Sequence, residues 1–480
     1  MASNGGDKKL HIVMFPWLAF GHFFPNLELA KLIAQKGHLI SFVSTPRNID
    51  RLPKLPPNLA SHLQFIKLPL PKLHNLPDNA EATTDVPYNV VPFLKKAYDA
   101  LEPPLTSFLE SSNPDWIFYD FAPYWVGPLA SKLGIKSVFF SIFTAPAMGF
   151  LGSPSGLVGT DPIRKKPENF LVPPPWVSFP TTVAFRYFEI MRISDSLSDD
   201  NESGVSDMYR MGAGIENCDI VAIRSCSEFE PEWIQVLENI YRKPVLPVGQ
   251  LPSTTYDDNE KEEEKNDTWR WVKDWLDQQR KGTVVYVAFG SEAKPSQEEV
   301  REIALGLEKS GLPFFWVLRI QRGPYDEDVL KLPDGFSDRI RGRGVVCTSW
   351  APQLRILGHE SVGGFLTHSG WTSVVEAIQK SKPLVLLTFL ADQGLNARVL
   401  EEKRMGYSIP RDERDGSFTS DSVAESLRLV LVEEEGRIYR EKIKEVKDLF
   451  VNKERQDRYV NDLLAYLEEY KKTKLGAKAG

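Results

Sequence analysis

The sequence predicts an α/β protein built from two doubly wound, parallel-sheet domains that face one another across a cleft. Its 480 residues exceed the ~250–300 residues beyond which a single hydrophobic core stops growing. A strand–helix–strand alternation begins near residue 11, and the same alternation begins again near residue 284. Strands that alternate with helices form parallel sheets with right-handed crossovers, so we expect two such sheets in succession.

The first half begins with a strand and a helix. Residues 11–15 (HIVMF) are a continuous apolar run, as expected for a strand that is buried on both faces. We expect residues 16–24 to form a loop, and a helix to begin with Pro25 in its first turn and to end at Gly37. Further apolar runs predict strands at residues 39–43, 116–119 and 137–141.

One stretch of the first half resembles a membrane segment in its length and lack of charge. Residues 137–160 contain no charged side chain, and a run of this length could cross a bilayer. However, Pro146, Pro154 and several glycines and serines interrupt it. We therefore predict a buried strand followed by a loop of small residues, with no insertion into a membrane.

The second half follows a strongly acidic stretch. Residues 251–267 hold seven acidic residues and two lysines, which favours a solvated inter-domain linker over a long surface loop within one domain. After this linker we expect strands at residues 284–289, 314–318, 362–367 and 384–389, with helices over 296–310 and from about 372. A last helix, residues 454–471, follows the second alternation, and we expect it to pack back on the first domain.

These boundaries divide the chain into four parts. Residues 1–250 are expected to form the first domain, 251–267 the linker, 268–453 the second domain, and 454–480 the C-terminal helix and tail.

The composition excludes several classes of protein. The net charge is −7 and no long basic run occurs, so nucleic acid is not an expected partner. The three cysteines, Cys218, Cys226 and Cys347, are scattered and predict neither a disulfide framework nor a zinc site. The polar N-terminus has no apolar signal core. We therefore expect a cytoplasmic protein.

Polar side chains follow each predicted strand, at the edge where parallel sheets bind ligands. In the first half they are His22, Asp120 and Thr144. In the second half they are Ser291, the run from His368 to Ser373, and the pair Asp392–Gln393. Because both edges can face one cleft, these side chains are candidates for a single site.

The segment from Thr367 to Glu376 is the strongest of these candidates. A strand ends there, a glycine permits a tight turn, and a helix begins, which favours an anion such as phosphate at the free backbone N–H groups. Ser373 and His368 can add hydrogen bonds, whereas the carboxylate of Glu376 suits ribose hydroxyls. The chain lacks the dinucleotide fingerprint G-x-G-x-x-G, the phosphate loop G-x-x-x-x-G-K-[ST] and a usable G-x-S-x-G elbow.

Residues 350–393 (WAPQLRILGHESVGGFLTHSGWTSVVEAIQKSKPLVLLTFLADQ) resemble the 44-residue signature box of the plant family 1 UDP-sugar-dependent glycosyltransferases. The run PWLAFGHFFP near the start and Phe289-Gly-Ser291 agree with that family, and the resemblance covers essentially the whole chain. It implies the GT-B fold, in which two Rossmann-like domains hold the acceptor and the UDP-sugar respectively. Residues 44–56 resemble the branch that glycosylates flavonoid and terpenoid glycosides.

The resemblance also implies residue roles in the donor site. Trp350 would stack on the uracil, and Gln353 and Glu376 would bind the ribose. The diphosphate would contact Ser291, His368 and Ser373, while Asp392 and Gln393 would bind the sugar. Thr144, Trp371 and Thr372 are assigned to the donor site as well. Ser369 and Thr372 depart from the usual cysteine and asparagine, and Ser381–Lys382 stand where a glycine is common.

The expected reaction is an inverting transfer, with His22 as the base and Asp120 orienting it. We expect an aromatic acceptor wall made of Phe20, Trp125, Phe143 and Phe150. No metal or other cofactor is expected, because the one D-x-D motif, Asp326-Glu-Asp328, lies in a charged loop. We predict a monomer that uses UDP-glucose on a secondary metabolite or its glycoside. The alternatives are a UDP-rhamnose-dependent enzyme and a UDP-sugar-binding protein with little transferase activity.

Overall fold

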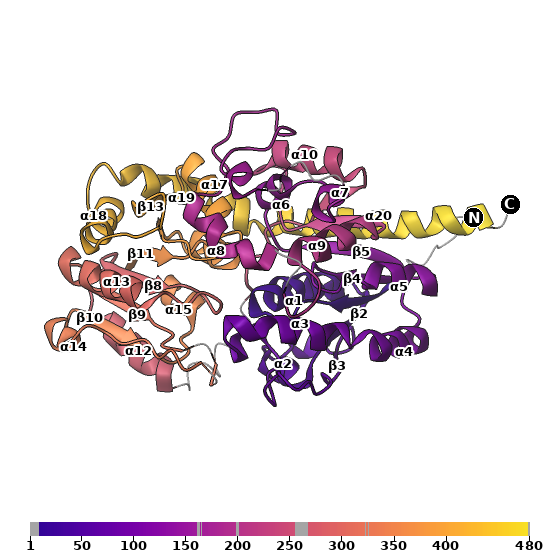
Figure 1. The fold of residues 1–480 in the computed structure, drawn as a ribbon, viewed down its shortest axis with the longest axis horizontal. Helices are drawn as coiled ribbons and strands as arrows, with labels where there is room; N and C mark the ends of the chain where they lie inside the picture. The colour runs from indigo at the N-terminus through magenta and orange to yellow at the C-terminus, as the bar shows by residue number, and fades with distance from the viewer. Residues whose placement is uncertain are drawn as a thin grey trace.

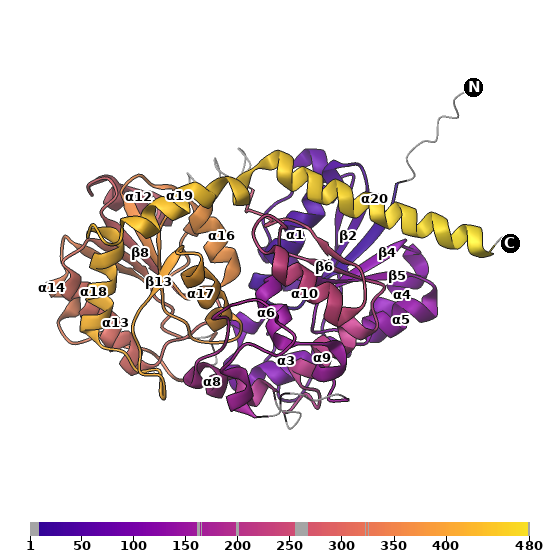
Figure 2. The ribbon, with the colours of Figure 1, turned by 90° about the horizontal axis from the view of Figure 1, so that it is seen from above.

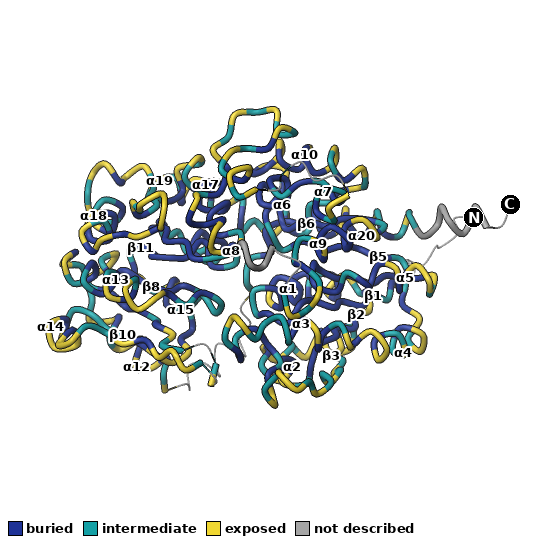
Figure 3. The backbone as a smooth tube through the Cα atoms, in the orientation of Figure 1, coloured by how far each residue is buried: buried dark blue, intermediate teal, exposed yellow. Residues whose placement is uncertain are grey.

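The computed structural model describes residues 9–160, 164, 166–197, 201–254, 267–321, 323–324 and 326–478. Within them the chain forms two α/β domains that lie side by side (Figure 1). The predicted linker falls largely on residues 255–266, which lie outside the described residues. The central strands of both sheets are deeply buried, whereas the strands at the sheet edges are only partly buried (Figure 3).

The first domain contains a seven-stranded parallel sheet with the order β3-β2-β1-β4-β5-β6-β7. Its strands are β1 (His11–Phe15), β2 (Leu39–Ser44), β3 (Leu63–Lys67), β4 (Trp116–Tyr119), β5 (Lys136–Ser141), β6 (Ile220–Ile223) and β7 (Val245–Pro247). The four predicted strands of this half are confirmed as β1, β2, β4 and β5. The order reverses between β1 and β4, which makes the carboxyl ends of these two strands a switch point where a ligand can bind.

The second domain contains a six-stranded parallel sheet with the order β10-β9-β8-β11-β12-β13. Its strands are β8 (Val284–Ala288), β9 (Phe314–Val317), β10 (Gly344–Cys347), β11 (Val362–Thr367), β12 (Leu384–Leu386) and β13 (Gly406–Ser408). The four predicted strands are again present. The switch point of this sheet lies between β8 and β11.

Helices fill the crossovers between these strands. In the first domain they are α1 (Phe20–Gln35), α2 (Pro46–Arg51), α3 (Val91–Asp99), α4 (Glu102–Ser112), α5 (Val126–Leu133), α6 (Ala145–Leu151), α7 (Pro154–Leu157), α8 (Tyr187–Leu197), α9 (Asp207–Glu216) and α10 (Pro231–Tyr241). The second domain contains α12 (Asp267–Asp277), α13 (Gln297–Ser310), α14 (Phe336–Arg339), α15 (Gln353–Gly358), α16 (Trp371–Gln379), α17 (Gln393–Glu402), α18 (Ser420–Leu431) and α19 (Arg437–Val451).

Helix α1 begins at Phe20, five residues before the predicted start. The backbone N–H groups of His22 and Phe23 donate to the carbonyl oxygen of Ala19, so the helix is already formed before Pro25. Pro25 therefore lies inside the helix rather than in its first turn. The expected loop over residues 16–24 is wrong for its second half, and His22 stands on the first turn of a helix.

The uncharged stretch 137–160 is not a strand followed by a loop. Strand β5 is followed by helices α6 and α7, which begin at the hydroxyl caps Thr144 and Ser153. Pro146 and Pro154 lie in the first turns of these helices, where the missing N–H costs nothing. Across the described residues, no helix combines the length and apolar character needed to cross a membrane.

The two domains share a continuous apolar core. On β8, the side chains of Val284, Tyr286 and Ala288 belong to the same buried cluster as the first domain. The alternate residues Val285 and Val287 belong to a separate cluster on the other face of the second sheet. One face of the second sheet is therefore packed into the core that the two domains have in common.

Helix α20 (Lys453–Lys478) follows α19 and leaves the second domain. It runs along the first domain and ends far from the second one (Figure 2). The Gln456 side chain donates to the carbonyl oxygen of Val248 over 2.7 Å, and the Tyr470 hydroxyl donates to Asp219 over 3.2 Å.

Candidate active site

A cavity of about 3210 Å³ lies between the two domains. It is lined by residues that follow β1 and β4 in the first sheet and β8, β11 and β12 in the second sheet. The switch points of both sheets therefore open into the same space. The residues predicted from these strand ends are brought together there, with the exceptions described below.

His22 and Asp120 form a buried pair at the first switch point. The Nδ1 atom of His22 lies 2.7 Å from Oδ2 of Asp120, and the two residues are 8% and 2% exposed. The same carboxylate oxygen accepts the backbone N–H of Trp17 over 2.8 Å, which fixes its position. Because a carboxylate only accepts, Nδ1 carries the proton, and Nε2 is left with a lone pair that can accept a proton.

Helix α16 presents its N-terminus to the cavity from the second switch point. Gly370 is the N-cap and provides no side-chain cap, so the N–H groups of Trp371, Thr372 and Ser373 have no partner within the helix. The helix dipole adds partial positive charge at this end. The arrangement suits a phosphate group.

The ring of His368 packs beside this helix start. Gly290 has a φ of +73°, and a Cβ atom there would lie 2.6 Å from Nε2 of His368. Burial lowers the pKa of His368 to about 4, so the ring is neutral near pH 7. Among the described residues its Nδ1 atom has no hydrogen-bond partner, although it is buried. A buried polar atom of this kind is available to a ligand.

The predicted ribose-binding residues form one hydrogen-bonded group. The Gln353 amide donates to Glu376 over 2.7 Å and to the Ser373 hydroxyl over 3.0 Å. The other carboxylate oxygen of Glu376 accepts from the Ser253 hydroxyl over 2.8 Å. Burial raises the pKa of Glu376 above its ordinary value. Trp350 lines the same part of the cavity and is 59% exposed, so its indole face is open to a flat base.

Asp392 and Gln393 line the cavity at the start of α17. The side-chain oxygen Oε1 of Gln393 accepts hydrogen bonds from the backbone N–H groups of Phe389 and Leu390. Its side-chain amide nitrogen therefore points away from these two N–H groups. Burial raises the pKa of Asp392, and His22 is close enough to lower it in part. The base and the predicted sugar-binding carboxylate therefore face the same region of the cavity.

The structure places two of the four predicted acceptor residues on the cavity wall. Phe20 and Phe143 line the cavity, and the Phe143 ring lies 5.8 Å from that of His22. Trp125 does not line it, because its indole donates to Asp99 and packs on Phe15 behind the wall. Phe150 is fully buried against Phe185 and the guanidinium of Arg164.

The structure places three further predicted donor residues mainly at the domain interface. Thr144 is fully buried, caps α6, and donates to Asn396 of the second domain over 3.1 Å. The Trp371 indole donates to Gln250 of the first domain over 2.9 Å, so its backbone N–H is what it offers to a phosphate. The Thr372 hydroxyl accepts from Arg224 of the first domain. The sequence assignment could not foresee these contacts, since each partner is distant along the chain.

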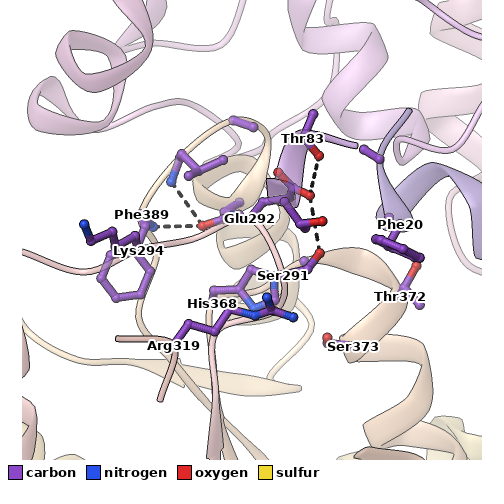
Figure 4. A pocket seen from close by; sticks show the side chains of 18 of the residues that line it. Phe20, Thr83, Ser291, Glu292, Lys294, Arg319, His368, Thr372, Ser373 and Phe389 are labelled. Carbon is purple, nitrogen blue, oxygen red and sulfur yellow. Dashed lines mark hydrogen bonds between the residues drawn. The ribbon is translucent and has the colours of Figure 1, made fainter. Parts of the chain in front are cut away.

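Several cavity residues were not predicted from the sequence. Figure 4 shows Glu292, whose carboxylate accepts the hydroxyls of Thr83 over 2.7 Å and Ser291 over 3.3 Å, linking the two domains across the cavity. Arg319, which follows β9, and Arg224, which follows β6, also line the cavity. Each of these two arginines follows a strand, and this position is the sequence signal that could have identified them. Strand β6, however, was not predicted from the sequence.

The motif Asp326-Glu-Asp328 lines the cavity, and the Asp326 carboxylate is buried in an ion pair with Lys294. Lys294 donates to Asp326 over 2.7 Å and to the carbonyl oxygen of Asp328 over 2.6 Å. In the part of the chain that the structure describes, no group of three or more His, Cys, Asp or Glu side chains is arranged to hold a metal ion.

Comparisons with known proteins identify the family. The sequence profile described as UDP-glucoronosyl and UDP-glucosyl transferase matches residues 237–460. UDP-glycosyltransferase 91A1 of Arabidopsis thaliana is 54% identical over 97% of this chain and 98% of that protein. Soyasaponin III rhamnosyltransferase of Glycine max is 41% identical over 98% of both chains.

Solved structures share the fold. The crystal structure of Glycyrrhiza uralensis UGT73P12 complexed with glycyrrhetinic acid 3-O-monoglucuronide superimposes with a TM-score of 0.79 at 21% identity, over 98% of both chains. The two parallel-sheet domains therefore form the GT-B fold that the sequence predicts. On this evidence the chain belongs to the plant family 1 UDP-glycosyltransferases and is a glycosyltransferase enzyme.

Proposed function

We propose that the chain transfers glucose from UDP-glucose to a hydroxyl group of a plant secondary metabolite or its glycoside, with inversion at the anomeric carbon. The observation that supports this most directly is His22, which is held by the buried Asp120 and lines the same cavity as the N-terminus of α16. A base at one side and an anion site at the other are the two parts that a direct displacement needs.

In the proposed mechanism, Nε2 of His22 removes the proton from the acceptor hydroxyl as its oxygen attacks the anomeric carbon. Asp120 holds the ring through Nδ1 and stabilises the imidazolium that forms. The bond to the UDP oxygen breaks on the opposite face of the sugar. The N–H groups of α16 and the ring of His368 stabilise the charge that develops on the diphosphate. The proposed mechanism therefore uses no metal ion.

The sugar end of the site supports glucose as the donor. The carboxylate of Asp392 can accept from sugar hydroxyls, and the Gln393 amide can donate to them, because its oxygen is already bonded to the backbone. Glutamine at the end of the signature box is also less typical of the family's galactose users, and no arginine adjoins this pair in the sequence to bind a uronate.

UDP-rhamnose is the second candidate donor. A relative that is 41% identical over nearly the whole chain is named soyasaponin III rhamnosyltransferase. Asp392 and Gln393 are compatible with the hydroxyls of either sugar. The two donors differ at one hydroxyl group and in ring stereochemistry, so a direct competition separates them.

The cavity supports a large acceptor. Its volume of about 3210 Å³ exceeds the ~300–1,000 Å³ of ordinary ligand pockets, leaving room for a sugar-bearing scaffold beside the donor. Phe20 and Phe143 supply an aromatic wall, and Thr83 and Glu292 supply polar groups that suit hydroxyls. We place the reaction in the cytoplasm, in keeping with the three free, buried cysteines, and we further propose that the enzyme acts as a monomer.

The test is a transfer assay with equal amounts of UDP-glucose, UDP-rhamnose and UDP-galactose on a panel of plant glycosides and aglycones, read by the mass of the products. We expect glucosylated products, and a loss of turnover by about 10²–10⁴ in His22→Ala with UDP binding retained. A clear preference for another donor would overturn the assignment of glucose. Tight UDP binding without any transfer would favour the alternative of a binding protein.

A further inference from the structure

Arg224 is a buried cation at the boundary of the two domains. It follows β6 of the first domain, is 2% exposed and lines the cavity. Its guanidinium donates to the carbonyl oxygens of Gln250 over 2.9 Å and Leu251 over 3.3 Å, and to the Thr372 hydroxyl over 2.7 Å. These bonds use three of its five N–H groups. Burial lowers its pKa to about 10, so it stays charged at neutral pH.

All three of these acceptors are neutral. Two other arginines with buried side chains are paired with carboxylates: Arg210 binds Asp99 over 2.6 Å, and Arg411 binds Glu299 over 3.1 Å. Within the described residues, Arg224 has no carboxylate at ion-pair distance. A buried charge without an opposite charge is costly, which points to an anion that arrives with a ligand.

The nearest carboxylates are already engaged by other groups. Glu376 accepts from Gln353 and Ser253, and it affects the pKa of Arg224 only at longer range. Glu28, the other carboxylate that affects this pKa, accepts from Lys31 over 2.8 Å and from Thr254 over 2.6 Å. Neither carboxylate neutralises the guanidinium directly.

The contact with Thr372 shows where such an anion would lie. Thr372 is the second residue of α16, so the guanidinium is one hydrogen bond away from the helix turn whose N–H groups face the cavity. The ring of His368, whose buried Nδ1 has no partner among the described residues, lies against Gly370 at the start of the same helix. The unpaired guanidinium of Arg224 and the N-terminus of α16 with His368 thus both favour a negatively charged group at the start of this helix.

We propose that Arg224, a residue of the first domain, binds the diphosphate of the UDP-sugar. This inference rests on the proposed function, since it assigns a further ligand to the same donor. It makes the diphosphate a bridge between the domains: Ser291 and Ser373 hold it from the second domain, and Arg224 holds it from the first. Donor binding would then draw the two domains together.

The experiment compares UDP with uridine, which lacks the phosphates. Dissociation constants of both are measured by calorimetric titration for the wild type, Arg224→Met and Arg224→Lys. Removing a charged hydrogen bond to phosphate predicts UDP binding at least tenfold weaker in Arg224→Met, with uridine binding unchanged within twofold. Arg224→Lys keeps the charge and is expected to lose less UDP affinity than Arg224→Met.

Arg210→Lys is the matched control, because Arg210 is equally buried in the first domain but does not line the cavity. We expect it to bind UDP and uridine as the wild type does. If Arg224→Met does not fold, the ratio of UDP to uridine affinity in Arg224→Lys decides. Equal effects on UDP and uridine, or no effect on either, would overturn the inference alone. A wild type that binds no UDP would overturn the proposed function as well.

Discussion

Replacing Asp120 with asparagine tests the proposed base directly. One oxygen of Asp120 accepts both the His22 ring and the Trp17 backbone N–H. An asparagine can place its single carbonyl oxygen there and keep both bonds, so the position of the ring is retained. The negative charge is what the substitution removes, and that charge matters only once His22 has taken a proton.

The magnitude follows from the geometry. The Nδ1–Oδ2 distance of 2.7 Å puts the centres of the two charges roughly 4 Å apart. At an effective dielectric constant of about 20 their attraction is about 4 kcal/mol. Each ~1.4 kcal/mol of lost transition-state stabilisation costs a factor of ten in rate. Because the amide dipole recovers part of the loss, we expect kcat to fall by about 10²–10³.

The assay measures kcat and KM for an acceptor found in the product screen, together with the dissociation constant of UDP. We expect the UDP affinity to stay within about twofold, since the pair interacts with the acceptor and not with the diphosphate. Asp219→Asn is the control, because Asp219 pairs with Lys136 away from the cavity. An Asp120→Asn enzyme with kcat within threefold of the wild type would refute charge stabilisation of the base.

Three further predictions concern other residues. Burial raises the pKa of Glu230 to about 7, so the folded protein binds this proton more tightly than the unfolded chain. The contribution of this carboxyl to stability is therefore fully present below about pH 4.5 and falls by about 3 kcal/mol as the pH rises to 7; denaturant titrations of Glu230→Gln are expected to lack this decline. His368, with a pKa of about 4, is expected to take up a proton when UDP binds near pH 5.5, and calorimetry in buffers of different ionisation enthalpy measures this. A smaller uptake in the wild type than in His368→Gln would contradict it. Gly290→Ala is expected to displace the His368 ring and to weaken UDP binding at least tenfold with little change for uridine, whereas unchanged UDP affinity would show that the ring is not held by this contact.

The strands and the order of the domains could be predicted because buried parallel strands are continuous apolar runs. The strands predicted over residues 11–15 and 284–289 are examples that the structure reproduces almost to the residue. The start of α1 could not be read from Pro25, because tertiary packing extends the helix past a proline that local rules place at its beginning. Short, mixed strands such as Leu63–Lys67 gave too weak a pattern.

The candidate site, like the fold, could be predicted from the sequence only in part. The positions of His22 and Asp120 could be predicted because each comes shortly after a strand, and that of Glu376 because it lies in the recognisable motif that begins α16. The assignment of Trp125 and Phe150 to the acceptor wall was wrong, because an aromatic residue near a strand end can face either the cavity or the core behind it. Arg224 was missed because its significance depends on Thr372, which lies 148 residues later in the chain and in the other domain.

The path of helix α20 has a practical consequence for exchanging parts between members of this family. The chain enters the second domain after residue 254 and returns to the first domain at α20, so the first domain is assembled from two segments that are not contiguous in sequence, whereas the second domain is a single segment. The Tyr459 hydroxyl, near the start of α20, contacts Ser227 and Glu228 of the first domain. A chimera joined only within residues 251–267 would pair this helix with a foreign surface. A second junction near residue 452 keeps the helix with its own partner, and the donor half can then be replaced as a cassette.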